Sequence, residues 1–212
     1  MVRIDVYADV VCPWCYIGEK RLEKALVMRP DLVVTRRWRP FQLRSEMPAG
    51  GLPWPGFARE KFGGEANARA AFGQVAALGA EEGIHFDFGR VASAPNTVDA
   101  HRLILHADDY GLQWETTNSL FHAYFAEGAN LNDPLDLTSA AGKAGLDTEE
   151  VRNFLSGSGL RDEVWQSQEK AGRIGVGGVP FYIFDGRHGL SGAQPVEVFV
   201  QALDALRADL AG

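Results

Sequence analysis

Hydrophobic residues occupy every second position at the start of the chain. They are Val2, Ile4, Val6 and Ala8. A period of two residues is typical of a β-strand, so we expect a strand over residues 2–8. Strong helix formers predominate over residues 19–26, and Pro13 is well tolerated in the first turn of a helix. Residues 32–38 are rich in β-branched side chains and predict a second strand.

Helical spacing predominates in the middle of the chain. Before it, residues 45–56 carry Gly50, Gly51 and three prolines, which is typical of a loop. Asn96 or Thr97 is the expected cap of one helix, and Gly111 is its expected end. The helical patterns cover residues 57–82, 98–110, 115–125, 135–144 and 160–173, with a short segment after Asp147.

A strand pattern returns near the end of the chain. Residues 180–184 are apolar and aromatic, and the dipeptide Asp185-Gly186 is typical of a hairpin turn. Residues 187–191 would form the return strand. From Pro195 onward, apolar residues keep the spacing of an amphipathic helix. The order is strand–helix–strand, a long helical block, and strand–strand–helix.

This order predicts an α/β fold in which the two ends of the chain share one small sheet. Residues 1–44 and 174–212 would form the α/β domain, and residues 45–173 would form a helical insertion. With 212 residues, of which 46% are hydrophobic, the chain can bury a sizeable core.

Charge and hydropathy exclude several classes of partner. The formal net charge of −7 argues against nucleic acid or an anionic membrane as the main partner. No apolar run approaches the roughly 18–20 residues of a membrane span. The chain begins with a strand pattern instead of the features of a signal peptide, so we expect a cytoplasmic protein. The oligomeric state stays open.

The chain contains only two cysteines, Cys12 and Cys15, separated by Pro13 and Trp14. A C-x-x-C that leads into a helix is typical of a dithiol that cycles to a disulfide. A thiol attacks as its thiolate, and the unpaired N–H groups of a helix N-terminus favour that charged form. We therefore expect Cys12 to face solvent and attack, and Cys15, one turn further in, to resolve the mixed disulfide.

Two other interpretations of the cysteine pair are weaker. A zinc site needs two more ligands, and the five histidines are scattered along the chain. His101 and His106 lie about 140° apart around a helix, so they do not easily share one metal ion. We expect no metal. A purely structural pair is the second minor alternative.

The segment around the cysteines resembles the DsbA family of thiol–disulfide oxidoreductases, and most closely its cytoplasmic FrnE-type branch. The likeness begins with residues 9–18, which read DVVCPWCYIG. Residues 38–43, 96–103 and 175–181 are also similar to that branch. The resemblance implies a thioredoxin fold interrupted by a helical insertion. It also implies disulfide exchange with protein or small-molecule thiols, without a cofactor beyond glutathione as a potential co-substrate.

The resemblance also implies roles for single residues. Cys12 would be the nucleophile, Cys15 the resolving thiol, and Pro180 the cis-proline of the thioredoxin fold. The backbone of Val179 could then pair with an extended substrate near Cys12. Pro13 and Trp14 would tune the dithiol and contact substrate. Among the aromatic residues, we expect Trp14 and Tyr16 at an exposed apolar rim that contacts substrate. We expect Phe121, Tyr124 and Phe125 in the core.

Three residues are candidates for an accessory role. Asp9 could carry protons to and from Cys15 if it is buried, and Asn96 and His101 lie in a segment that resembles the family. As an alternative function, the layout is similar to kappa-class glutathione transferases and 2-hydroxychromene-2-carboxylate isomerases. Those proteins keep a serine at the position of Cys12, so the presence of both cysteines favours redox chemistry. A non-catalytic binding module is the third hypothesis.

Overall fold

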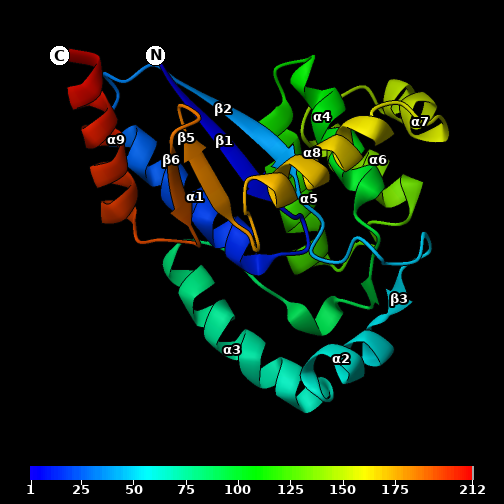
Figure 1. Ribbon diagram of the computed structural model, residues 1–212. Helices are drawn as coiled ribbons and strands as arrows, with labels where there is room; N and C mark the ends of the chain where they lie inside the picture. Colours follow the sequence, from blue (N-terminus) through cyan, green and yellow to red (C-terminus); the bar gives the residue numbers. More distant parts are fainter. Residues whose placement is uncertain (212) are drawn as a thin grey trace.

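A four-stranded sheet forms the centre of the computed structural model, which describes residues 1–211. The strand order is β2-β1-β5-β6 (Figure 1). The strands are β1 (Val2–Ala8), β2 (Val34–Pro40), β5 (Phe181–Phe184) and β6 (His188–Ser191). β1 pairs with β2 in parallel and with β5 antiparallel, and β5 pairs with β6 antiparallel. The prediction that both ends of the chain share one sheet is confirmed.

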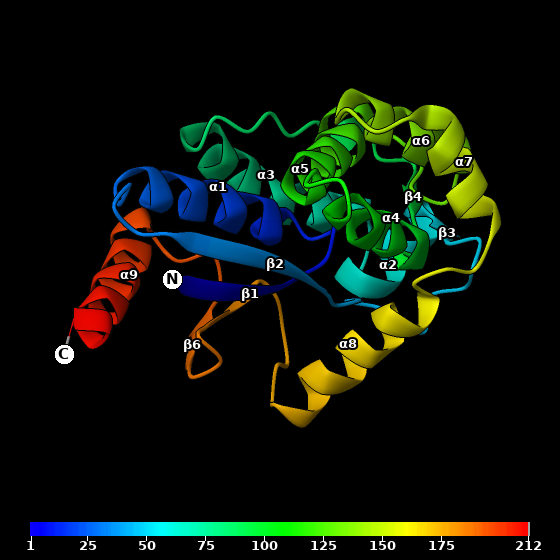
Figure 2. The same ribbon diagram turned by 90° about the horizontal axis from the view of Figure 1, so that it is seen from above.

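Helices cover both faces of this sheet. α1 (Pro13–Val27) packs against α9 (Val196–Ala211), while α8 (Arg161–Arg173) packs against β2. Figure 2 shows α1 on one side of β1 and β2, and α8 on the other. Because β1 is covered on both faces, Asp5 and Tyr7 are buried together with its apolar residues.

The hairpin between β5 and β6 forms where the sequence predicts it. Asp185 and Gly186 both adopt positive φ angles, of 48° and 71°. Such angles at both central positions are typical of the two-residue turns that suit the twist of antiparallel strands.

The segment between β2 and α8 is mainly helical. Its helices are α2 (Trp54–Phe62), α3 (Glu65–Glu81), α4 (Val98–Asp108), α5 (Gln113–His122), α6 (Pro134–Lys143) and α7 (Thr148–Ser156). A single 3₁₀ turn spans Phe88–Arg90, and a π-helical turn, Ala123–Glu127, continues α5. No helix in residues 1–211 has the length and apolar character needed to cross a membrane. The domain boundaries after residues 44 and 173 stay a prediction.

The helical pattern over residues 57–82 divides into two helices. Gly63 and Gly64 adopt φ angles of +73° and +126°, which L side chains rarely adopt. α2 ends at this pair and α3 begins at Glu65. The chain therefore turns, and the two helices form an arch below the sheet in Figure 1.

The prediction of a loop over residues 45–56 is wrong at its end. Leu52 and Pro53 form strand β3, which pairs antiparallel with β4 (Ser93–Ala94), and α2 already begins at Trp54. A two-residue strand has no hydrophobic period of its own, because its pairing depends on a partner distant in the sequence.

Candidate active site

Cys12 is the N-cap residue of α1. Its backbone is extended, with φ −96° and ψ 108°, and Pro13 follows in the first turn. The Cys12 carbonyl accepts hydrogen bonds from the N–H groups of Cys15 at 3.0 Å and Tyr16 at 3.3 Å. The predicted helix start is confirmed, and both cysteines are free thiols. Cys12 thus lies at the positive end of the helix dipole.

The loop before β5 contacts Cys12. Because β1 and β5 pair antiparallel with Tyr7 opposite Phe181, the residues after β1 and before β5 meet at one edge of the sheet. The Cys12 thiol donates a hydrogen bond to the Val179 carbonyl oxygen at 3.7 Å. The Val179–Pro180 peptide bond is cis, as the resemblance implied.

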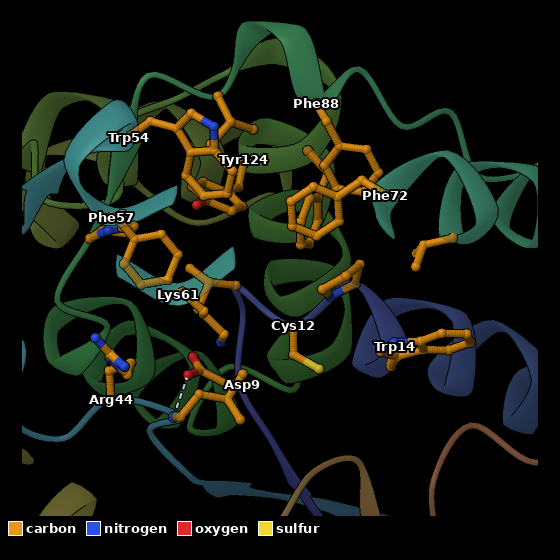
Figure 3. A pocket seen from close by; sticks show the side chains of 18 of the residues that line it. Asp9, Cys12, Trp14, Arg44, Trp54, Phe57, Lys61, Phe72, Phe88 and Tyr124 are labelled. Carbon is orange, nitrogen blue, oxygen red and sulfur yellow. Dashed lines mark hydrogen bonds between the residues drawn. The ribbon is translucent and has the colours of Figure 1, made fainter. Parts of the chain in front are cut away.

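The expectation that Cys12 faces bulk solvent is wrong. Only 4% of Cys12 and 2% of Cys15 are exposed. Cys12 instead lines a partly open pocket of about 490 Å³. Figure 3 shows Cys12 between Lys61 and Trp14, with the rings of Phe72 and Phe88 above it. The arch of α2 and α3 covers the thiol, so a substrate would reach it through the pocket.

Burial strongly affects the pKa of the Cys15 thiol. It raises the pKa of Cys15 well above its ordinary value, and the hydrogen bond and charge interaction with Cys12 raise it further. The hydrogen bond from the Asp9 backbone acts in the opposite direction. Cys15 therefore holds its proton at neutral pH, and a nearby base would have to accept that proton before Cys15 could attack a disulfide.

Asp9, which lines the same pocket as Cys12, contacts His101 in the protein interior. Asp9 is 1% exposed and His101 is 0% exposed. Because β1 and β2 are parallel, Asp9 lies beside the chain that leaves β2, and its Oδ2 accepts the Leu43 N–H at 2.8 Å. Asp9 Oδ1 lies 3.3 Å from His101 Nε2, outside hydrogen-bond geometry.

The tautomer of His101 follows from its other neighbour. Trp38 Nε1–H donates to His101 Nδ1 at 3.1 Å, so in neutral His101 the proton is on Nε2, which faces Asp9. The sequence hypothesis that Asp9 is buried next to the cysteines is therefore confirmed, whereas its role in proton transfer stays a prediction.

Asn96 lies apart from the dithiol. Its side chain accepts the Val98 N–H at 3.0 Å and donates to the Met47 carbonyl at 2.7 Å. These bonds fix the start of α4 and the loop after β2, and Asn96 does not line the pocket. An accessory role for Asn96 at the active site gains no support from this geometry.

Trp14 and Tyr16 have different surroundings. Trp14 lines the pocket and is 40% exposed, as predicted for a rim residue. Tyr16 is only 7% exposed and stacks on Phe121 at 4.8 Å, so its predicted place at the rim is wrong. The helical insertion covers this face of α1. The predicted burial of Phe121, Tyr124 and Phe125 is confirmed.

The aromatic wall of the pocket was not predicted from the sequence. It consists of Trp54, Phe57, Phe62, Phe72 and Phe88, which lie on α2, α3 and the 3₁₀ turn. The spacing of Trp54, Phe57 and Lys61 places these residues on one face of a helix and could have indicated this wall. Within residues 1–211, no cluster of three or more His, Cys, Asp or Glu side chains could hold a metal ion.

Comparison with known proteins places the chain in a family. A family model of the DSBA-like thioredoxin domain matches residues 3–204. The chain is similar to the crystal structure of a probable DsbA oxidoreductase from Streptomyces coelicolor, with 34% identity and a TM-score of 0.85. That alignment covers 96% of this chain and 88% of the other.

More distant structures share the fold. One is the cytosolic disulfide reductase DsbM from Pseudomonas aeruginosa, solved with glutathione, at 19% identity and a TM-score of 0.67 over 97% of this chain and 99% of that chain. Another is a 2-hydroxychromene-2-carboxylate isomerase, at 18% identity and a TM-score of 0.69 over 99% of this chain and 100% of that chain. The predicted thioredoxin fold with a helical insertion is confirmed, and the chain belongs to the DsbA-like thioredoxin-domain family of thiol–disulfide oxidoreductases.

Proposed function

We propose that this protein exchanges disulfides with thiol substrates through the Cys12–Cys15 pair. The observation that carries the proposal is the position of Cys12, which caps α1 at the wall of a pocket, with Cys15 one turn further in. Cys12 thus lies at the positive end of the α1 dipole. Burial, in contrast, raises the pKa of Cys15 and keeps it protonated until the mixed disulfide has formed.

The reaction has two steps in the reductive direction. The Cys12 thiolate attacks one sulfur of a substrate disulfide, forms a mixed disulfide and releases one substrate thiolate. Cys15 then loses its proton, attacks the Cys12 sulfur and releases the second thiolate. Two electrons pass from the enzyme dithiol to the substrate. External thiols, such as two molecules of glutathione, return the enzyme to the dithiol.

Asp9 is the proposed acceptor of the Cys15 proton. Its Oδ2 is occupied by the Leu43 N–H, whereas its Oδ1 receives no hydrogen bond within the described residues. That oxygen can accept a proton, and His101 Nε2 lies 3.3 Å from it, on the side that faces α4. His101 is therefore a positioning residue in this proposal, because it acts through Asp9.

The finer classification is also a proposal. The cytoplasmic FrnE-type branch is supported by the CPWC segment, and a cytoplasmic site of action is further supported by the likeness to DsbM, which is described as cytosolic. Substrates would be protein or small-molecule thiols. Glutathione as a co-substrate is supported by its presence in the DsbM structure.

A second candidate function is glutathione-dependent transfer or isomerisation. The fold shared with 2-hydroxychromene-2-carboxylate isomerase favours it. The resolving thiol at Cys15 has no use in such a reaction, so activity of this type would survive Cys15→Ser.

Thiol release in a single turnover tests the proposed function. Reduced protein is mixed with excess 4,4′-dithiodipyridine, and the released thiopyridone is counted by absorbance. We expect about two equivalents from the wild type, one from Cys15→Ser and a slow, minor release from Cys12→Ser, because Cys15 is buried. Two rapid equivalents from Cys12→Ser, or none from the wild type, would contradict the proposal.

A further inference from the structure

The pocket beside Cys12 is walled by stacked aromatic rings. Phe72 of α3 stacks on Phe88 with ring centroids 4.3 Å apart, and it lies 5.8 Å from the ring of Trp54. Trp54 in turn lies 5.4 Å from Phe57. This wall faces a space of about 490 Å³, which is within the range of small-molecule sites. A flat aromatic group fits such a wall better than a polar peptide backbone does.

Two cations line the same pocket, and they differ in their partners. The Arg44 guanidinium is held by Glu46 at 3.0 Å and Glu60 at 2.5 Å. The Lys61 Nζ instead lies 5.6 Å from the Phe57 ring, and it has no ion-pair partner in the part of the chain that the structure describes. Figure 3 shows Lys61 projecting between the aromatic wall and Cys12. Its charge is complementary to an anionic group on a pocket ligand.

We propose that the pocket accepts a small disulfide, or the corresponding thiol, that has an aromatic body and a carboxylate. The ring would lie against Phe72, the carboxylate at Lys61, and the sulfur at Cys12. This inference rests on the proposed function, because its ligand reacts at the same dithiol. The chemistry is the exchange already written. The aromatic disulfide gains two electrons and leaves as two thiols, and the enzyme dithiol becomes a disulfide.

Four disulfide probes separate the aromatic and the anionic contributions. The Cys15→Ser protein, which retains Cys12, is mixed with 5,5′-dithiobis(2-nitrobenzoate), which is aromatic and anionic, or with 4,4′-dithiodipyridine, which is aromatic only. Oxidised glutathione is anionic without a ring, and 2-hydroxyethyl disulfide has neither feature. Each rate is divided by the rate of 2-mercaptoethanol with the same probe, which removes differences in intrinsic reactivity. We expect saturation for the aromatic carboxylate and a normalised rate at least about tenfold above that of oxidised glutathione.

Substitutions of Phe72 and Lys61 test which residue provides the aromatic contribution and which the anionic one. Phe72→Ala should lower the normalised rates of both aromatic probes about tenfold. Lys61→Met should lower the rate of the aromatic carboxylate about fivefold and leave 4,4′-dithiodipyridine unchanged. Lys170→Met, an exposed lysine of α8, is the matched control and should change no rate. An unaltered rate with 2-hydroxyethyl disulfide shows in each variant that Cys12 is intact.

A measurement on the unmodified protein does not depend on any variant. 1-Naphthoate, which is unreactive, should slow the alkylation of Cys12 by iodoacetamide in a saturable manner, whereas acetate should not. Equal normalised rates for all four probes, or no protection by 1-naphthoate, would overturn the inference and leave the proposed function standing. A faster normalised reaction with a disulfide-linked peptide that carries phenylalanine next to its cysteine would overturn it in favour of a protein substrate. Failure of every probe to modify Cys12 would overturn the proposed function itself.

Discussion

A carboxylate buried without a cation is costly, and Asp9 has only partial compensation. One of its oxygens accepts the Leu43 N–H at 2.8 Å, and the other faces His101 at 3.3 Å without a hydrogen bond. Leaving such a group unsatisfied destabilises a protein by about 1–3 kcal/mol. The proposed role of Asp9 as acceptor of the Cys15 proton would give this arrangement a chemical use, because burial raises the pKa of Cys15.

We predict that Asp9→Asn slows the release of the second thiol and leaves the attack of Cys12 nearly unchanged. Loss of a general base typically costs about 100-fold or more in rate. Stopped-flow release of thiopyridone separates the two steps. The rate constant of the second step should increase with pH in both proteins, and its plateau should lie at a higher pH in the variant than in the wild type. A structural defect alone would not shift that pH profile.

Asp5→Asn is the matched control for Asp9. Asp5 is a buried carboxylate of β1, and its Oδ1 accepts a hydrogen bond from Arg39 Nε at 2.8 Å. The control should keep both rate constants of the wild type. An equal slowing by Asp5→Asn and Asp9→Asn would contradict the role of Asp9.

Local motifs determine which site residues the sequence could predict. Cys12, Cys15 and Pro180 lie in short, recognisable segments, so the start of α1 at Cys12 and the cis bond at Pro180 could be predicted. The contact of Asp9 with His101 joins segments that are distant in the chain. The sequence could therefore indicate each residue as a candidate, but it could not predict that the two side chains meet. Tyr16 was misplaced because an aromatic residue next to a C-x-x-C carries no local sign of the insertion that covers it.

At the scale of single elements, α1 contains a buried acid of its own, Glu19. Glu19 lies one turn after Cys15, and its carboxylate contacts the Arg36 guanidinium, which also stacks on Trp114 at 4.3 Å. Burial raises the pKa of Glu19 from 4.5 to about 7, although the charge of Arg36 opposes the shift. The folded protein therefore favours protonated Glu19. The contribution of this proton to the stability of the fold is fully present below pH 4.5 and is lost as the pH rises through about 7.

Glu19→Gln should therefore stabilise the protein in a pH-dependent way. Glutamine resembles the protonated acid at every pH, so wild type and variant should be equally stable near pH 4. At pH 8 the variant should be more stable by about 3 kcal/mol. Urea denaturation at both pH values measures the difference. Glu163→Gln, at an exposed position of α8, is the control and should follow the wild type. A stabilisation by Glu19→Gln that is the same at pH 4 and pH 8 would disprove the assignment.

Elements with a strong period were predictable, and short or interrupted elements were not. The alternating residues of β1 and the amphipathic pattern of α9 gave correct types and approximate bounds. β3 has two residues and exists only through its pairing with β4. The division of α2 from α3 depends on the left-handed conformations of Gly63 and Gly64, and glycine alone does not reveal which φ it adopts.

At the scale of the whole molecule, the sheet and the insertion build the site together. The parallel pairing of β1 with β2 brings Asp9 to Leu43, and the antiparallel pairing with β5 brings Val179 to Cys12. Trp38 of β2 then joins the sheet to the insertion through His101 of α4. The order of elements predicted the shared sheet. It carried no information about how α2 and α3 lie over Cys12, which depends on packing between distant segments.

The central claim is that Cys12 attacks and Cys15 resolves. Intact-protein mass spectrometry after brief exposure to oxidised glutathione, followed by peptide mapping, tests it most directly. We predict one stable glutathionyl group on Cys12 in Cys15→Ser, and in the wild type no adduct but a Cys12–Cys15 disulfide. A stable adduct on the wild type, an unmodified Cys15→Ser protein, or equally rapid modification of Cys15 in Cys12→Ser would contradict the account.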